Sequence, residues 1–215
     1  MEDRMEAIAK LRDAVLKGNI GQTPLLTRQA LDAGLEPALI LNDALISGMD
    51  EVGELFKAGE VYVPEVLLSA KSMQQAMQVL KPSLVKQGIK PRGKVVVGTV
   101  RGDLHDIGKN LVGMMLEGAG FEVIDLGNDV LPERFVDAAV EHKASIIGMS
   151  ALLTTTMSAM KETIDLLGRR RLGGSIRTMI GGAPVTAGFA KEIGADGYGN
   201  DAASAVDIAK GFVGQ

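Results

Sequence analysis

Two carboxylates and an imidazole lie close together in the stretch GTVRGDLHDIGKN, residues 98–110. Asp103 precedes His105 by two residues, Asp106 follows it directly, and His105 is one of only 2 histidines in the chain. A neutral imidazole is a common metal ligand, and a metal-bound histidine usually donates its other ring N–H to a carboxylate or carbonyl group. Together with the hydroxyls and glycines of two further turns described below, this spacing suggests a metal-binding histidine oriented by Asp103. The competing interpretation is a histidine that is merely solvated in a turn.

The elements around this stretch predict where it lies. Residues 94–100, KVVVGTV, form an apolar run typical of a buried strand, and a helical pattern follows from residue 107. The runs FEVIDLG, ASIIGMSAL, RTMIGGAPV and DGYGN then alternate with amphipathic segments. Five strand–helix units predict a parallel sheet with helices on both faces, in the flavodoxin-like order 2-1-3-4-5. In that order a crevice opens above the carboxyl ends of strands 1 and 3.

Three turns should meet at that crevice, since the carboxyl ends of parallel strands lie at one edge of the sheet. The turn after strand 3 supplies hydroxyl groups, and the turn after strand 4 supplies two glycines that leave backbone bare for a large flat or extended ligand. The residues concerned are Ser150, Leu152, Thr154, Thr155, Thr156, Gly181 and Gly182. A threonine run after a strand is also typical of a helix N-cap, which is the alternative for Thr154 or Thr155.

Other kinds of site stay open on these residues alone. A mononucleotide site is one alternative, although no GxGxxG or GxxxxGKS/T sequence is present to hold phosphates. A catalytic Asp–His–Ser relay is another, although no serine occupies a recognisable nucleophile elbow. The second histidine, His142, falls in the last turn of a predicted helix, where positive charge suits the helix dipole. We assign His142 no chemistry.

The first 90 residues follow a different pattern, with little that predicts a strand. Helical periodicity covers Glu2 to Lys17, Glu36 to about Lys57, and a long segment from Pro64. Another helix is expected between Thr23, as N-cap, and Gly34, as stop. We therefore expect a four-helix bundle in residues 1–90, a linker around QGIKPRGK, and the α/β domain in residues 91–215.

Composition excludes several classes of protein. The chain has 215 residues, 46% of them hydrophobic, which is enough for a substantial core. It has 0 cysteines, which excludes disulfides, zinc fingers, iron–sulfur clusters and thiol catalysis. A formal net charge of −4 gives no reason to expect binding to nucleic acid or an anionic membrane. Neither a signal peptide nor a bilayer-spanning apolar run is visible, so a cytoplasmic protein is expected.

The three turns taken together resemble the cobalamin-binding signature DxHxxG…SxL…GG. In this chain the signature consists of Asp103, His105, Gly108, Ser150, Leu152, Gly181 and Gly182. The segment VGELFKAGEVYVPEVLLSA, residues 52–70, resembles the helical cap that precedes this domain in methionine synthase. The same pair of domains forms the small corrinoid proteins of anaerobic methyltransferase systems, of the methylamine, methanol or betaine type. The resemblance covers nearly the whole chain.

The resemblance implies a cofactor and a set of roles. Cobalamin, as methylcobalamin or another corrinoid, would bind with its own base displaced from cobalt and with His105 as the lower metal ligand. Asp103 would accept a hydrogen bond from the other ring nitrogen. Thr156 would complete this relay with a hydroxyl, where methionine synthase has a serine.

The resemblance also implies which residues contact the cofactor. Phe56 and Val63 of the cap would cover its upper face, although both could instead be bundle core. The expected cofactor-binding residues are Gly102, Asp103, Leu104, His105, Asp106, Gly108, Ser150, Leu152, Thr154, Gly181, Gly182, Ala202, Phe56 and Val63.

The implied function is that of a corrinoid methyl carrier with no turnover of its own. One substrate-specific methyltransferase would load the methyl group, and a second would transfer it to tetrahydrofolate or coenzyme M. A reductive activation protein would be a further partner, and neither nucleic acid nor membrane is expected as one. A cobalamin-dependent sensor or regulator is the main alternative, and a mutase subunit is a third. Specificity for the methyl donor would reside in the partner methyltransferase.

Overall fold

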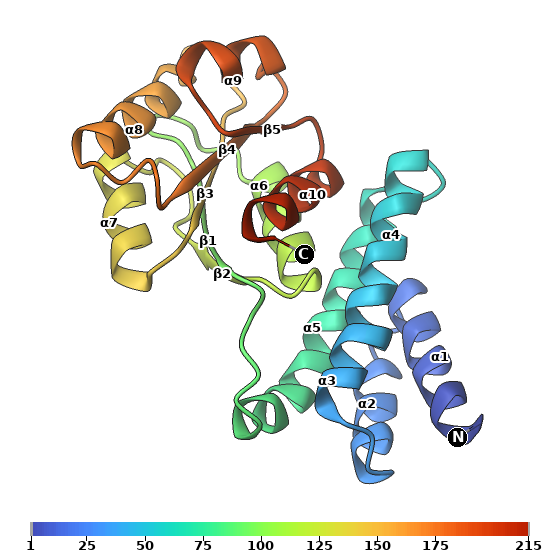
Figure 1. Cartoon of the computed structure of the whole chain (residues 1–215). Coiled ribbons are helices and arrows are strands. Elements are labelled where there is room, and N and C mark those ends of the chain that lie inside the picture. The colour runs from blue at the N-terminus through green and yellow to red at the C-terminus, as the bar shows by residue number, and fades with distance from the viewer. Residues whose placement is uncertain (1, 215) are drawn as a thin grey trace. The chain divides into compact units, whose positions relative to one another are not determined.

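The computed structural model describes residues 2–214, with side chains from residue 4 onward. Two compact units make up the chain (Figure 1). One contains the residues up to Pro91 together with Glu117–Gly120, and the other contains Arg92–Leu116 and the residues from Phe121 onward. No helix within residues 2–214 is long and apolar enough to cross a membrane.

The first unit is helical. Its elements are α1 (Glu2–Leu16), α2 (Thr23–Asp32), α3 (Pro37–Leu39), the π-helix η1 (Ile40–Ile46), α4 (Ser47–Ala58) and α5 (Val63–Lys86). Residues 37–58 are helical throughout, so α3, η1 and α4 together form the third of the four predicted helices. The core of the helical unit contains fully buried side chains from several helices, among them Leu11, Leu45, Met73 and Leu80.

One boundary of the bundle differs from the prediction. Thr23 is the first residue of α2 rather than its N-cap. Its Oγ1 donates to the carbonyl oxygen of Asn19 at 2.7 Å and lies 2.5 Å from Oγ of Ser72 on α5. The hydroxyl is fully buried between helices, so it pairs across the bundle instead of capping its own helix.

The second unit is an α/β domain. In chain order it contains β1 (Lys94–Thr99), α6 (Ile107–Gly118), β2 (Glu122–Asp125), α7 (Pro132–His142), β3 (Ile146–Ser150), α8 (Ser158–Arg169), β4 (Arg177–Gly181), α9 (Ala187–Ile193), β5 (Gly197–Gly199) and α10 (Ala202–Val213). The strands are all parallel and lie in the order β2-β1-β3-β4-β5, which confirms the predicted topology. His142 is the last residue of α7, as predicted.

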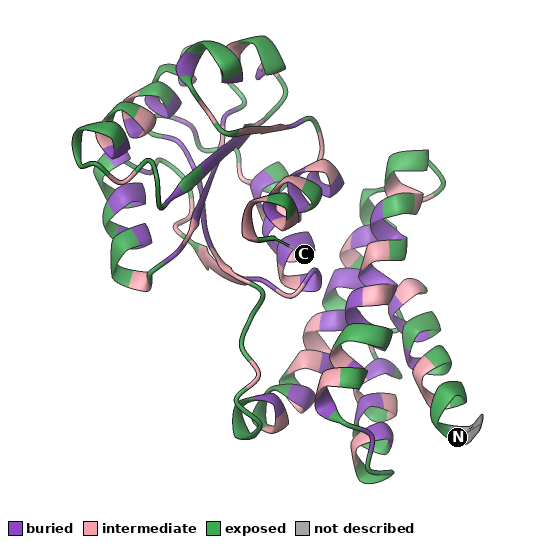
Figure 2. Cartoon of the chain, in the orientation of Figure 1, coloured by how far each residue is buried: buried purple, intermediate pink, exposed green. Residues whose placement is uncertain are grey.

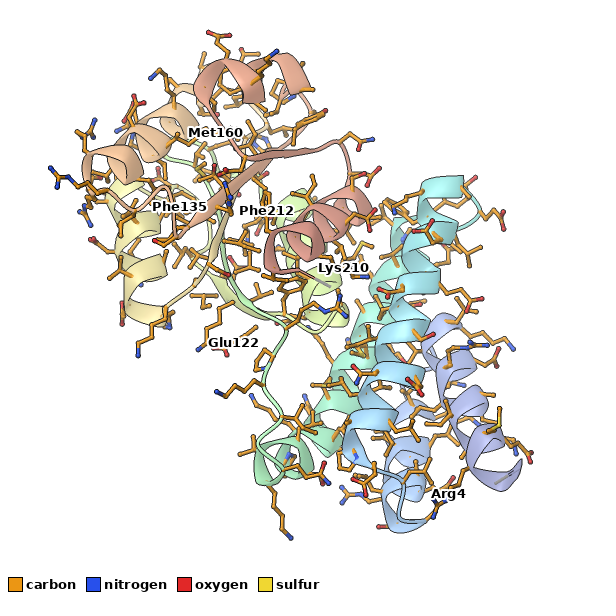
Figure 3. All side chains as sticks on the ribbon, in the orientation of Figure 1. Arg4, Glu122, Phe135, Met160, Lys210 and Phe212 are labelled. Carbon is orange, nitrogen blue, oxygen red and sulfur yellow. The ribbon has the colours of Figure 1, made fainter. Side chains whose placement is uncertain are left out.

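The sheet is buried because helices cover both of its faces (Figures 1 and 2). Every residue of β1 after Lys94 is buried, as expected for a central parallel strand. On the face covered by α7 and α8, Phe135 and Met160 are fully buried and belong to one core cluster with the strands (Figure 3). The apolar strands β1, of 6 residues, and β3, of 5 residues, therefore hold their carboxyl ends at a common edge.

The register places the strand ends in one row. Thr99 of β1 pairs with Ser150 of β3, Ser150 pairs with Gly181 of β4, and Gly181 pairs with Gly199 of β5. The turns that follow these residues therefore begin side by side. The three turns predicted to converge do so because of this register.

Candidate functional site

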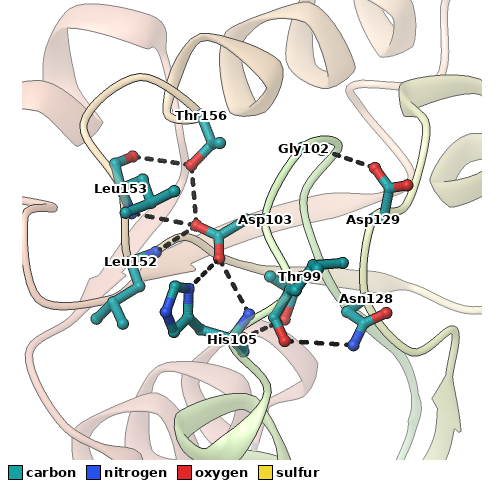
Figure 4. A network of polar contacts seen from close by, with 10 residues as sticks. Thr99, Gly102, Asp103, His105, Asn128, Asp129, Leu152, Leu153 and Thr156 are labelled. Atoms are coloured by element: carbon teal, nitrogen blue, oxygen red, sulfur yellow. Dashed lines mark hydrogen bonds and ion pairs between the residues drawn. The ribbon is translucent and has the colours of Figure 1, made fainter.

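His105 lies in the turn between β1 and α6 and carries a partly open imidazole. Its Nδ1 is 2.8 Å from Oδ1 of Asp103 (Figure 4). An ionised carboxylate only accepts hydrogen bonds, so Nδ1 donates, and in the neutral ring the lone pair is on Nε2. The His105 side chain is 53% exposed, whereas that of Asp103 is 0% exposed. The buried carboxylate of Asp103 therefore orients the His105 ring, and Nε2 is available to a ligand.

Asp103 is the centre of the polar network. Besides His105, its carboxylate accepts hydrogen bonds from the backbone amides of Leu152 at 2.7 Å and Leu153 at 3.1 Å, and from Oγ1 of Thr156 at 2.9 Å (Figure 4). Burial alone would raise the pKa of Asp103, but the hydrogen bonds from Leu152, His105 and Thr156 outweigh it and hold that pKa well below its ordinary value. Asp103 is therefore a stable anion beneath the imidazole.

Thr156 has one proton and two acceptors within reach. Its Oγ1 lies 2.9 Å from Oδ2 of Asp103 and 2.8 Å from the carbonyl oxygen of Leu153. A hydroxyl donates to one acceptor at a time, so rotation about its C–O bond adds or removes one hydrogen bond on Asp103. Thr156 is buried in the turn before α8, whose N-cap is Met157. Neither Thr154 nor Thr155 caps that helix, so the helix-cap alternative was wrong.

The turn after β2 also contacts the histidine loop, although no role was predicted for it from the sequence. Oδ1 of Asp129 accepts a hydrogen bond from the Gly102 amide at 2.7 Å, and Nδ2 of Asn128 donates to the Leu104 carbonyl at 3.3 Å (Figure 4). Oγ1 of Thr99 donates to the carbonyl oxygen of His105 at 2.9 Å. The Asn–Asp pair that follows FEVIDLG was the available signal, since both residue types commonly bond to backbone groups in turns.

Lys109 is a second residue that the sequence analysis passed over. It lies in the first turn of α6 and its side chain is only 4% exposed. Its Nζ lies 2.5 Å from Oδ2 of Asp125 at the end of β2 and 2.6 Å from Oδ1 of Asn110. This ion pair between a buried lysine and an exposed aspartate ties the start of α6 to the end of β2, next to the histidine loop.

Two glycines on the site differ in why they are glycines. A Cβ on Gly182 would lie 1.9 Å from the carbonyl oxygen of Ala151, and the φ of Gly182 is +126°, so the chain itself excludes a side chain there. A Cβ on Gly108, by contrast, would meet nothing within 4 Å. The structure therefore explains Gly182 but leaves open space at Gly108, where a bound ligand could approach the backbone.

Exposed aliphatic residues lie next to His105 in the chain and in the β3–α8 turn. Leu104 is 69% exposed and Ile107 is 79% exposed, on either side of His105. Leu152 and Leu153, whose amides bond to Asp103, are 43% and 42% exposed. Exposed apolar groups clustered around a few oriented polar groups are typical of a ligand site. Ile107 and Leu153 were not among the predicted site residues.

The remaining predicted residues occupy different environments. Gly102 and Thr154 are exposed, and Asp106, Ser150 and Gly181 are half-buried at the ends or turns of the strands. Ala202 is buried at the first position of α10, so its side chain offers little surface. In the helical unit, Phe56 is half-buried on α4 and Val63 is 37% exposed at the start of α5. Neither belongs to the buried core of the bundle.

Comparison with known proteins matches both units. Residues 93–207 match a family model described as "B12 binding domain", and residues 7–81 match a second model with the same description. A corrinoid protein of Desulfitobacterium hafniense is 40% identical over 98% of this chain and 99% of its own length. Trimethylamine corrinoid protein 2 of Methanosarcina acetivorans is 40% identical over 99% of both chains.

A solved structure agrees with these matches. The methanol:cobalamin methyltransferase complex MtaBC of Methanosarcina barkeri contains a chain that is 34% identical, with a TM-score of 0.85 over 97% of this chain and 80% of that one.

Proposed function

Because the chain belongs to the family of B12-binding corrinoid proteins, we propose that it carries a methyl group on the cobalt of a bound corrinoid, with His105 as the lower cobalt ligand. The observation that carries this proposal is the hydrogen bond from Nδ1 of His105 to the buried carboxylate of Asp103, which leaves Nε2 open. The corrinoid's own nucleotide base would then be displaced from the metal. When bound, the corrinoid supplies a cobalt centre that accepts and gives up the methyl group.

The residues present fit such a group. A corrin ring already occupies four positions of its cobalt, so the protein needs to offer one nitrogen, and His105 offers one. The exposed side chains of Leu104, Ile107 and Leu152 supply apolar surface for the edge of a large ring. Gly108 leaves room for close approach of the ring, because a Cβ there would meet nothing within 4 Å.

Asp103 and Thr156 would tune the histidine. Asp103 holds the Nδ1 proton, which fixes the tautomer and makes Nε2 a better donor to the metal. When the Thr156 hydroxyl turns from Asp103 to the Leu153 carbonyl, the carboxylate loses one hydrogen bond and attracts the Nδ1 proton more strongly. Rotation of the Thr156 hydroxyl would thus change the strength of the His105–metal bond without any movement of the backbone.

The partners follow from what the relatives are named for. Relatives include proteins named for trimethylamine, dimethylamine and monomethylamine, and the MtaBC structure is of a methanol:cobalamin methyltransferase complex. We propose a substrate-specific methyltransferase as the loading partner and a second methyltransferase, acting on tetrahydrofolate or coenzyme M, as the unloading partner. A reductive activation protein would restore the cofactor after accidental oxidation.

Electron paramagnetic resonance of the protein loaded with Co(II) cobinamide tests the role of His105. Cobinamide lacks the nucleotide base, so splitting of the cobalt signal by a nitrogen outside the corrin ring must come from the protein. We expect splitting from one nitrogen in the wild type and in His142→Ala, which removes the only other histidine. His105→Ala should lose it. Nitrogen splitting that persists in His105→Ala would contradict the proposed ligand.

A further inference from the structure

Asp129 occupies an unusual backbone conformation beside the candidate site. Its φ is +53°, and it shares a positive φ with only two other non-glycine residues within residues 2–214, Lys143 and Arg171. Lys143 is the C-cap of α7, and Arg171 follows the C-cap of α8, positions where a left-handed residue commonly ends a helix. Asp129 lies instead in the loop between β2 and α7.

A glycine would adopt this conformation with less strain, so the side chain of Asp129 needs a reason of its own. Its Oδ1 accepts a hydrogen bond from the Gly102 amide at 2.7 Å. Its backbone amide donates to the carbonyl oxygen of Asp103 at 3.0 Å. One residue thus bonds to the two peptide groups that flank the Gly102–Asp103 link, through the N–H of Gly102 and the carbonyl oxygen of Asp103. In its left-handed conformation, Asp129 presents its amide and its carboxylate to the same turn.

The opposite side of the turn is held by the β3–α8 turn. The carboxylate of Asp103 accepts hydrogen bonds there from the amides of Leu152 and Leu153 and from the Thr156 hydroxyl. Within its own turn, the amide of Asp103 donates to the Val100 carbonyl at 3.1 Å. Asp103 is therefore clamped between two turns, with Asp129 acting on its backbone and the β3–α8 turn on its side chain (Figure 4).

We infer that Asp129 is a positioning residue for His105, acting through the backbone of Asp103. This inference rests on the proposed role of His105 as a cobalt ligand. Removal of the Asp129 carboxylate frees the Gly102 peptide, lets the Asp103 carboxylate turn away from Nδ1, and leaves the imidazole free to exchange tautomers. Mutation of the outer partners of metal-bound histidines commonly lowers metal affinity about 10- to 100-fold. We expect removal of the Asp129 carboxylate to lower the affinity of His105 for cobalt by about tenfold.

Two variants separate the carboxylate from the backbone conformation. Asp129→Gly keeps the positive φ and removes the acceptor, whereas Asp129→Asn keeps the positive φ and a side-chain oxygen that can accept from Gly102. Asp196→Ala is the matched control. Oδ2 of Asp196 accepts from the Thr178 amide at 2.8 Å, so this variant also removes a carboxylate–backbone bond, but at the amino ends of β4 and β5.

The first measurement uses the protein without cofactor. Nitrogen-15 spectra of the imidazoles, recorded at about pH 8.5 where free imidazole is neutral, report the tautomer. Only His105 and His142 contribute, so His142 serves as an internal reference. We expect the Nδ1–H tautomer of His105 in the wild type, Asp129→Asn and Asp196→Ala, and a mixture of tautomers in Asp129→Gly.

The second measurement is the nitrogen splitting in Co(II) cobinamide complexes of the same four proteins. Asp129→Gly should lose the splitting in a substantial fraction of molecules, and the other three should retain it. Identical spectra for Asp129→Gly and the wild type in both measurements overturn the inference, as does an equal change in Asp196→Ala or a failure of Asp129→Asn to restore the wild-type signals. Absence of splitting in the wild type itself refutes the proposed function instead, and the tautomer measurement still decides the role of Asp129.

Discussion

Asp103 combines complete burial with an ionised carboxylate, and hydrogen bonds make the combination stable. Two backbone amides and the Thr156 hydroxyl replace the water that the carboxylate loses. The His105 ring and its amide supply two more donors. A carboxylate so well solvated by the protein can orient an imidazole and remain charged at neutral pH.

The depressed pKa of Asp103 predicts how the stability of the cofactor-free protein depends on pH. A carboxylate whose pKa is lower in the folded than in the unfolded state adds stability that is fully present above the unfolded value of about 4. That stability declines as the pH falls from there toward the folded pKa. At neutral pH we expect Asp103→Asn to lower the free energy of unfolding by on the order of 2–3 kcal/mol.

Urea unfolding at several pH values measures this difference, which should shrink steadily below about pH 4. Asp106→Asn is the control, because the Asp106 side chain makes no hydrogen bond or ion pair within the described residues. A stability difference for Asp103→Asn that is constant from neutral to strongly acidic pH would contradict the assigned cause.

At the scale of elements, α6 begins where the ligand is proposed to bind, and its glycines can be compared. Gly108 and Gly113 lie on the same helix. A Cβ on Gly108 would meet nothing within 4 Å, and one on Gly113 would make an ordinary 3.8 Å contact with Val123. Neither glycine is required by the protein's own packing. They differ in that only Gly108 belongs to the proposed site.

Alanine substitutions at these two glycines should therefore separate folding from binding. Both Gly108→Ala and Gly113→Ala should raise the free energy of unfolding by about 0.4–1 kcal/mol, because alanine restricts the unfolded chain. Only Gly108→Ala should weaken corrinoid binding, by about tenfold or more, since the added methyl group would crowd the ring. Chemical denaturation and absorbance titration measure the two quantities. Equal corrinoid affinities in the two variants would remove Gly108 from the site.

The tip of the helical unit between α4 and α5 makes a separate prediction. Phe56 is half-buried there and lies outside the bundle core, and we predict that its side chain acts as a lid on the cobalt-bound methyl group. Phe56→Ala should leave corrinoid affinity nearly unchanged. It should speed the loss of the methyl group under illumination, because an apolar lid keeps the methyl radical beside cobalt after light breaks the methyl–cobalt bond. Photolysis rates measure this, with Leu25→Ala, an exposed leucine on α2, as the control. Equal rates in Phe56→Ala and the wild type would assign Phe56 a purely structural role.

At the scale of the whole molecule, two compact units account for the described chain, and each matches a B12-binding family model. The net charge of −4 disfavours direct binding to nucleic acid, which requires clustered lysine and arginine. A carrier and a sensor would use the same units differently. A carrier presents its cofactor to two enzymes in turn, whereas a sensor changes its assembly or its affinity for DNA.

We therefore expect the reduced, corrinoid-loaded protein alone to leave methylated substrates unchanged. With a cognate substrate methyltransferase it should accept one methyl group per cobalt, and a second methyltransferase with its acceptor should remove that group. Absorbance spectra and product analysis follow both steps, and His105→Ala serves as the comparison. Light-dependent oligomerisation with specific DNA binding, and no methyl transfer with either enzyme, would favour the sensor instead.

The sequence by itself determined the strand order and the edge of the sheet at which Asp103 and His105 lie. These follow from local patterns, because apolar runs mark the strands and parallel topology brings their carboxyl ends together. The tertiary structure alone decided which backbone groups face Asp103. The amides of Leu152 and Leu153 bond to its carboxylate and the amide of Asp129 bonds to its carbonyl oxygen, from two turns far apart in the chain. An amide carries no sequence signature, and its direction depends on the register of the sheet and the path of each turn. The burial of Lys109 against Asp125 likewise depends on how α6 packs beside β2, which no local pattern records.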